Sequence, residues 1–257
     1  MQIDFGKTAS DYGRHRQGFP DQFFDRVFAS GLIAPGQRLL DLGTGTGAVA
    51  RGMALRGCAV TGLDPSVSMT DQARLLDGEA GVDIRYVTAK AEETGLADGA
   101  YDVVTAGQCW HWFDRPRAAA EVQRVLKPGG LLMIAHFDWL PLKGSTVAAT
   151  EALILKHNPE WNMAGGNGLH PWWFADLEQA GYREIESFTF DLAVPYTHEA
   201  WLGRIRASAG VGASLKPDAV ARFDADHKAM LERDFPEDPL TAPHRIFVIH
   251  ARPPSRH

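Results

Sequence analysis

Leu39-Leu40-Asp41-Leu42-Gly43-Thr44-Gly45-Thr46-Gly47 joins a short apolar run to three glycines at alternate positions. The apolar run predicts a buried strand over 38–42, and Ala48 to Arg56 predicts the helix that follows it. Glycines allow positive backbone torsions and let the main chain approach a ligand closely. A tight strand-to-helix turn that binds nothing explains the same glycines, so this pattern alone is a weak signal of a nucleotide-type site.

The same alternation of strand and helix continues along the chain from residue 37 to about 136. Further strands are predicted at 58–63, 82–87, 101–106 and 131–135, and further helices at 66–76 and 117–126. Ser66 is a predicted N-cap, and Lys127-Pro128-Gly129-Gly130 is a predicted turn. Strands separated by helices imply crossover connections and a parallel sheet covered on both faces. The sequence therefore predicts a doubly wound, Rossmann-like α/β fold.

Outside this core the pattern is less regular. Helices are predicted at 8–31 (two, the second over 21–30), 171–180, 197–209 and 217–235, and strands at 184–194 and 245–251. The segment 140–170 is rich in Gly, Asn, Pro and Trp and is expected to be irregular. We predict one domain over 1–257, with a cofactor-binding core at 8–140. Segments 140–170 and 195–240 are expected to form a lid that carries the substrate site.

The composition of the chain argues against several classes of function. The chain has 257 residues, 45% of them hydrophobic, and a formal net charge of -6. This acidic balance, without a basic block, argues against nucleic-acid binding, and no apolar run approaches a membrane span. The N-terminus lacks the apolar core of a secretory signal. Neither Cys58 nor Cys109 sits in a metal-like or redox-like pair. We expect a cytoplasmic protein with a small-molecule partner and no metal, and its oligomeric state stays open.

Asp64 sharpens the interpretation of the glycines. It ends the second predicted strand, where a carboxylate can accept hydrogen bonds from both ribose hydroxyls of a cofactor. The glycines at alternate positions also differ from the G-x-G-x-x-G fingerprint, which places a pyrophosphate on a helix N-terminus. A cofactor with an adenosine ribose and no phosphate, such as S-adenosylmethionine, fits this pattern.

Asp41 to Gly47 resembles the first motif of the class I S-adenosylmethionine-dependent methyltransferases (the methyltransferase type 11 domain). Asp64 matches the ribose-binding acid of that family, and Ala89-Lys90-Ala91-Glu92 resembles its adenine-side loop, where many members carry an acid in place of Lys90. Arg124 to Leu131 resembles its helix-to-strand turn. The family fold implied is a sheet of about seven strands whose last strand is antiparallel and inserted, which suits the predicted strand 245–251.

Three further segments resemble the subgroup related to trans-aconitate methyltransferases: Thr105 to Asp114, Ala9 to Pro20, and Trp201 to Arg206. On the resemblance, Arg16 is expected to bind a carboxylate through a bidentate pair. The complete set of expected cofactor-binding residues is Tyr12, Arg16, Asp41, Gly43, Thr44, Gly45, Asp64, Pro65, Met69, Lys90, Ala91, Glu92 and Gln108.

Methyl transfer depends mainly on positioning two reactants, and a base is needed only for an acceptor that enters protonated. His111 is the candidate catalytic base because it follows the fourth strand, although a packing role between two tryptophans is the competing interpretation. Asp114 is expected to cap the next helix, and Cys109 to be buried and inert. Trp172 and Trp173, being adjacent, cannot both face inward. The expected substrate-binding residues are Arg14, Trp110, Trp112, Trp139, His170, Trp172 and Arg204.

The sequence thus predicts S-adenosylmethionine-dependent methyl transfer to a carboxylate or to an aromatic or heterocyclic metabolite. An NAD-dependent oxidoreductase and a non-catalytic cofactor-binding regulatory module are the alternatives.

Overall fold

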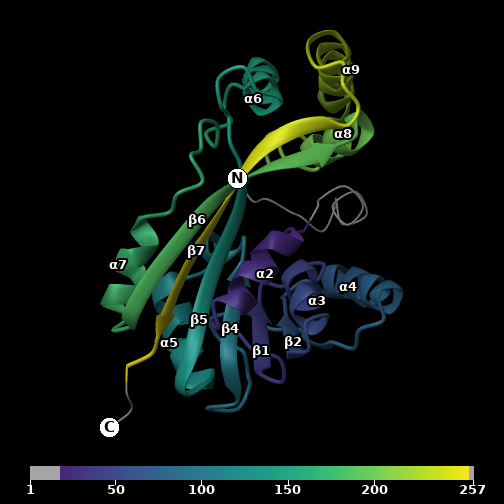
Figure 1. Ribbon diagram of the computed structural model, residues 1–257. Coiled ribbons are helices and arrows are strands. Elements are labelled where there is room, and N and C mark those ends of the chain that lie inside the picture. Colours follow the sequence, from purple (N-terminus) through teal and green to yellow (C-terminus); the bar gives the residue numbers. More distant parts are fainter. Residues whose placement is uncertain (1–17, 255–257) are drawn as a thin grey trace. The chain divides into compact units, whose positions relative to one another are not determined.

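The apolar run at the start of the glycine stretch forms the central strand of the sheet. In the computed structural model, which describes residues 18–254, strand β1 spans Arg38–Leu42, and its three leucines are fully buried. It pairs in parallel with β2 (Ala59–Leu63) on one side and β4 (Tyr101–Gly107) on the other (Figure 1). A strand buried on both sides explains why this run lacks polar alternation.

The sheet is mixed and has seven strands, in the order β3-β2-β1-β4-β5-β7-β6. The remaining strands are β3 (Arg85–Val87), β5 (Leu126–Trp139), β6 (Arg183–Tyr196) and β7 (Leu240–Arg252). The predicted Rossmann-like fold of about seven strands is confirmed, and the last strand is inserted between β5 and β6. The strand order reverses between β1 and β4, which is the point where ligands of such sheets bind.

The described chain divides into two compact units. The core unit contains residues 18–136, 170–189 and 247–254, and the accessory unit contains residues 137–169 and 190–246. Strands β5, β6 and β7 each contribute residues to both units. Both segments expected to form the lid fall in the accessory unit, and their placement over the strand ends stays a prediction. The first of the two predicted N-terminal helices lies outside the described residues.

The helices of the core unit follow the predicted ones within a few residues. They are α2 (Asp21–Ala29), α3 (Ala48–Ala54), α4 (Val67–Ala80), the 3-10 turn η2 (Trp110–Trp112), α5 (Arg115–Val125) and α7 (Trp172–Gln179). Ser66 occupies the N-cap position of α4, but its hydroxyl contacts Ser68 and makes no capping hydrogen bond. Asp114 caps α5 as predicted, since its carboxylate accepts a hydrogen bond from the backbone N–H of Arg117.

The accessory unit holds α6 (Thr146–His157), α8 (His198–Arg206) and α9 (Pro217–Asp234). Helix α9 packs against α6 and α8, with a hydrogen bond between His157 and Asp226 and an ion pair between Arg206 and Asp224. The expectation that 140–170 is irregular is wrong for α6. Ser145 caps this helix by accepting a hydrogen bond from the backbone N–H of Ala148. The Gly, Asn and Pro residues of the segment belong to the loops on either side.

The predicted turn over Lys127-Pro128-Gly129-Gly130 is also corrected. Strand β5 begins at Leu126, directly after α5 ends, and Leu126 pairs with Tyr101. The next pair joins Val103 to Leu131, so the extra residues are accommodated as an irregularity of the sheet. Lys127 makes an ion pair of 2.7 Å with Asp102, and this contact fastens the irregularity to β4.

Among residues 18–254, no helix is both long and apolar enough to cross a membrane.

The contact between α2 and α3 yields a test of the core packing. A Cβ added at Gly52, on α3, would lie 2.1 Å from Cζ of the buried Phe24. We expect Gly52→Ala to lower the free energy of unfolding by about 1–3 kcal/mol through overpacking. Urea denaturation followed by circular dichroism measures this change.

Gly78→Ala is the matched control, because a Cβ at this position of α4 meets no atom within 4 Å. Replacing glycine by alanine in a helix interior is expected to stabilise the protein by about 0.5–1 kcal/mol. Equal effects of the two substitutions would contradict the packing of α3 on Phe24.

Candidate functional site

The glycine turn occupies residues 43–47, between β1 and α3. Gly43, Gly45 and Gly47 have φ angles of 56°, 56° and 77°, in the left-handed region that favours glycine. A Cβ at Gly43 would lie 2.9 Å from Cβ of Cys109, and a Cβ at Gly47 would lie 2.6 Å from Oη of Tyr86. Two of the three glycines are therefore required by close packing as well as by backbone torsion.

Asp41 lies beneath this turn and organises it. Its carboxylate is 1% exposed and accepts hydrogen bonds of 2.6 Å from the hydroxyls of Thr44 and Thr105. Burial raises its pKa to about 6. Asp41 and Thr44 were expected to contact the cofactor. In the structure the carboxylate of Asp41 and the hydroxyl of Thr44 hold the turn against β1 and β4, and their contact with a cofactor stays a prediction.

Asp64 joins the glycine turn to the end of β2. One carboxylate oxygen accepts a 2.9 Å hydrogen bond from the backbone N–H of Gly45, and the other accepts one of the same length from Ser66. The side chain is partly exposed, and partial burial raises its pKa. An ionised carboxylate has about four acceptor positions, so two hydrogen bonds leave capacity for further donors such as hydroxyl groups. Met69 is close as well, with its Cε 3.5 Å from the Cβ position of Gly45.

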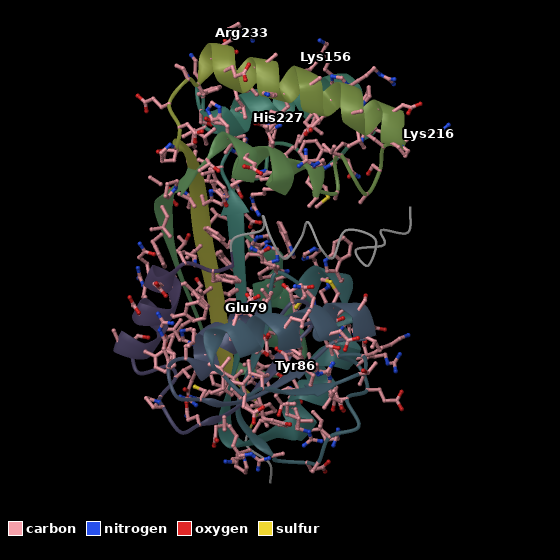
Figure 2. The ribbon with its side chains drawn as sticks, turned by 90° about the vertical axis from the view of Figure 1, so that its right-hand side faces the viewer. Glu79, Tyr86, Lys156, Lys216, His227 and Arg233 are labelled. Atoms are coloured by element: carbon pink, nitrogen blue, oxygen red, sulfur yellow. The ribbon has the colours of Figure 1, made fainter. Side chains whose placement is uncertain are left out.

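A network behind the turn was not predicted from the sequence. Arg51 donates a 3.2 Å hydrogen bond to the carbonyl of Thr46 and makes a 2.7 Å ion pair with Asp77. The Tyr86 hydroxyl donates to the other oxygen of Asp77 at 2.8 Å. Figure 2 labels Tyr86, which lies on β3. These residues lie on α3, α4 and β3, and no sequence spacing links them. They support the turn from the side of the helices.

The loop after β3 meets the segment after β4. Lys90 is exposed, Ala91 is buried, and Glu92 accepts a 2.8 Å hydrogen bond from the backbone N–H of Asp114. Gln108 has a positive φ of 59°, and its N–H donates to Ala135 on β5. The structure thus gathers the predicted cofactor residues of the core unit around the carboxyl ends of β1, β2 and β4. Pro65 follows Asp64 in this group, and Tyr12, Arg14 and Arg16 lie outside the described residues.

The residues that follow Gln108 divide into buried and exposed. Cys109 is buried with its thiol toward the carbonyl of Leu42, and burial raises its pKa well above the ordinary value. Trp110 is fully buried and packs on Phe113, which gives it a packing role. His111 is exposed and Trp112 is 49% exposed.

Helix α7 divides its two tryptophans in the same way. Trp172 is 52% exposed, Trp173 is fully buried, and His170 lies between their rings at the start of the helix. The prediction that Trp172 and Trp173 cannot both face inward is confirmed. In the core unit, four residues expected near the substrate therefore occupy two neighbouring segments: Trp110, Trp112, His170 and Trp172.

Two other residues expected near the substrate form a separate group in the accessory unit. The guanidinium of Arg204 is 5.4 Å from the ring centre of Trp139 and 6.0 Å from that of Tyr196. Arg204 is only 9% exposed, and the indole N–H of Trp139 donates to Glu151 at 2.8 Å. A buried cation among aromatic rings suits an anionic or flat ligand. Tyr196 was not among the predicted site residues.

Comparison with known proteins identifies the family. Residues 40–134 match the model of a methyltransferase domain. A malonyl-[acyl-carrier protein] O-methyltransferase of Geobacter sulfurreducens is 31% identical over 201 residues, which cover 73% of this chain and 71% of that protein. The chain belongs to the class I S-adenosylmethionine-dependent methyltransferases.

Two further proteins are similar to this chain over nearly all or part of its length. An uncharacterized methyltransferase of Mycobacterium tuberculosis is 37% identical over 132 residues, and the match spans about half of each chain (51%). A solved structure of Haemonchus contortus phosphoethanolamine N-methyltransferase 2 superposes with a TM-score of 0.58 at 19% identity. That superposition covers 97% of this chain and 58% of the other, and it shows the shared fold. The trans-aconitate subgroup stays a prediction.

The buried carboxylate under the turn predicts a pH dependence of stability. The pKa of Asp41 in the folded methyltransferase is about 6, against 3.8 for an ordinary aspartate, so the folded state holds this proton more tightly. The contribution of Asp41 to stability is therefore greatest below about pH 4 and is lost as pH rises through 6. Relative to Asp41→Asn, which stays neutral, we expect the wild type to lose roughly 2 kcal/mol between pH 4 and pH 7.

Urea denaturation of both proteins across this pH range measures the difference, and other titrating groups cancel in the comparison. Asp83→Asn, at an exposed position near β3, is the control and should follow the wild type at every pH. Parallel curves for wild type and Asp41→Asn would contradict the burial of an ionisable group beneath the turn.

Proposed function

We propose that this protein transfers the methyl group of S-adenosylmethionine to a small-molecule acceptor. The observation that carries the proposal is the hydrogen bond that the carboxylate of Asp64 accepts from the backbone N–H of Gly45. This contact places a carboxylate with spare acceptor capacity beside a glycine turn, at the reversal of strand order where ligands of such sheets bind. The turn packs closely against Cys109 and Tyr86 because Gly43 and Gly47 have no side chains. Its glycines do not follow the G-x-G-x-x-G pattern that serves a pyrophosphate.

The three similar proteins are all named as methyltransferases, but two of those names point to different methyl acceptors. The Haemonchus contortus enzyme was solved with S-adenosylhomocysteine and phosphomonomethylethanolamine, whereas the Geobacter sulfurreducens relative is named for malonyl-[acyl-carrier protein]. Because these acceptors differ, only the residues of this protein itself indicate its acceptor.

We infer an acceptor that carries a carboxylate or an aromatic or heterocyclic ring. Trp112 and Trp172 are large aromatic side chains about half exposed in the core unit, where they can stack on a ring. Arg204 offers the planar guanidinium that pairs with carboxylates, and it lies beside Trp139. Transfer relies on proximity and orientation, with His111 as the residue that accepts a proton from a protonated acceptor.

Asp64→Asn tests the donor site. The substitution keeps the shape of the side chain and one acceptor for Gly45, but it removes the charge that ribose hydroxyls would meet. Since hydrogen bonds to charged groups contribute about 1.5–3 kcal/mol, we expect the Kd for S-adenosylmethionine to rise by about 10- to 100-fold. Isothermal titration calorimetry measures the Kd, and thermal melting verifies that the variant is folded.

Asp83→Asn, the same chemical change at an exposed position, should bind like the wild type. The proposed site would be contradicted if the wild type did not bind S-adenosylmethionine, or if Asp64→Asn bound it with the same Kd. Binding of NADH in place of S-adenosylmethionine would favour the oxidoreductase alternative.

His111→Gln tests the proton acceptor. With acceptors found by screening carboxylates and phenols for release of S-adenosylhomocysteine, we expect kcat to fall by about 10²- to 10⁴-fold for a phenol. A carboxylate enters ionised and should lose little. His157→Gln, on α6, is the control. If kcat for the phenol is unchanged, His111 serves packing or orientation, and methyl transfer itself stands.

A further inference from the structure

Imidazole rings gather where β5 leaves the core unit. His136 follows Ala135, whose carbonyl accepts the N–H of Gln108, so it lies close to the end of β4. His170 comes from the segment just before α7 and packs directly on His136, and His111 lies on the other neighbouring segment. Residues separated by 25 and 34 positions in the sequence thus meet at one place.

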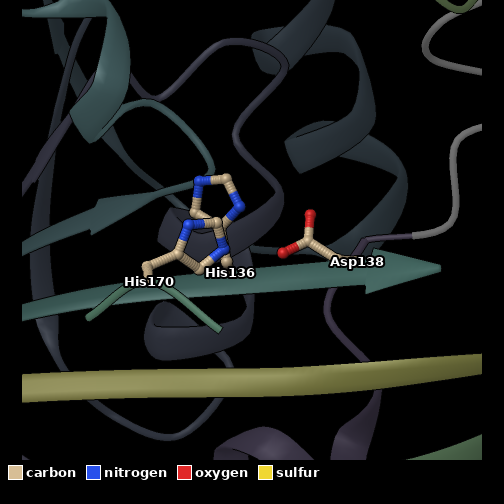
Figure 3. Close-up of side chains that lie close together, drawn as sticks. All are labelled: His136, Asp138 and His170. Atoms are coloured by element: carbon tan, nitrogen blue, oxygen red, sulfur yellow. The ribbon is translucent and has the colours of Figure 1, made fainter. Parts of the chain in front are cut away.

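The rings of His136 and His170 are close enough for one nitrogen of each to reach a common metal ion. The ring centres of His136 and His170 are 4.4 Å apart, and nitrogens of the two rings lie within 4.8 Å (Figure 3). Two imidazoles on one tetrahedral zinc ion, with Zn–N bonds of about 2.0–2.1 Å, hold their ligating nitrogens roughly 3.3 Å apart and their ring centres roughly 5 Å apart. Binding a common ion therefore requires the two rings to turn their nitrogens together and to separate slightly. Asp138, also drawn in Figure 3, follows two positions later on β5.

The surroundings fix both rings in place. His136 is 6% exposed on a strand of the sheet, and its ring centre lies 5.0 Å from that of Trp173. His170 stacks on Trp173 with ring centres 4.2 Å apart and planes at 6°, and Phe247 meets its edge at 5.5 Å. Rings held by packing lose little freedom on binding an ion, and this preorganisation favours a defined site.

The third histidine extends the cluster. The ring centre of His111 lies 5.1 Å from that of His136, and His111 is exposed where His136 is buried. The cluster therefore extends from the buried His136 to the exposed His111.

We propose that His136 and His170 form a binding site for a divalent transition metal ion such as Zn²⁺, Co²⁺ or Ni²⁺. Imidazole nitrogen suits these ions, whereas Mg²⁺ and Ca²⁺ prefer oxygen ligands. Two protein ligands leave coordination positions for water or for an atom of a bound molecule. Metal binding here does not depend on the proposed methyl transfer, although an acceptor heteroatom bound to the ion would link the two. The sequence predicted no metal, because neither of its two cysteines sits in a metal-like pair.

The test uses the full chain after treatment with a chelator. We expect Co²⁺ to bind with one ion per chain and to give the visible absorption of a nitrogen-ligated ion, and Zn²⁺ to displace it in calorimetry. Loss of an outer-shell partner alone typically costs 10- to 100-fold in metal affinity. We therefore expect His170→Gln to weaken binding by about 100-fold or more. Mg²⁺ should not compete.

His157→Gln is the matched control, because it removes a partly buried imidazole from α6 in the accessory unit and should leave the affinity unchanged. His136→Gln repeats the test at the buried ligand, with circular dichroism to verify folding, and the half-buried His170 keeps the test valid if that variant does not fold. Absence of Co²⁺ and Zn²⁺ binding would overturn the site, as would equal affinity in wild type and His170→Gln. S-adenosylmethionine titration of His170→Gln separates this result from failure of the proposed methyl-donor site.

Discussion

The buried carboxylate of Asp41 is the contact on which the functional end of the sheet depends. Its two oxygens receive the hydroxyls of Thr44, in the glycine turn, and Thr105, on β4. The turn is thereby fixed to the two strands between which the strand order reverses. The price is an ionisable group held away from water, with a pKa raised to about 6. Two short hydrogen bonds to the ionised form offset part of that penalty, as expected for a buried charge.

The other contacts of the site hold the same glycine turn from several sides. Above Asp41, the turn is narrow enough that Gly43 and Gly47 leave no room for a side chain. Asp64 closes the turn from β2, and Arg51 holds it from the side of α3. Each contact joins a different element to the same few backbone atoms. A site built in this way is rigid before any ligand arrives, and transfer by proximity requires that rigidity.

The histidine cluster shows how a second kind of site arises beside the first. His136 lies next to the end of β4 because β5 pairs with β4 in register, and His170 is brought there by the start of α7. The stack of His170 on Trp173 explains why one tryptophan of α7 is buried while Trp172 is exposed. The exposed tryptophan then lies near the cluster and available to a flat acceptor.

The sequence alone determined the local elements and predicted the candidate donor site. Strand β1, the glycine turn, Asp64 and the cap at Asp114 all rest on patterns within about twenty residues, where propensity and spacing act directly. It missed α6 because loop residues dominated that window, and it missed the start of β5 because Gly129 and Gly130 indicate a turn. Only the tertiary structure decided the partners of Asp41, the Arg51 network and the meeting of His136 with His170. These contacts join side chains from separate elements, and the order of strands in the sheet, which no local pattern encodes, brings them together.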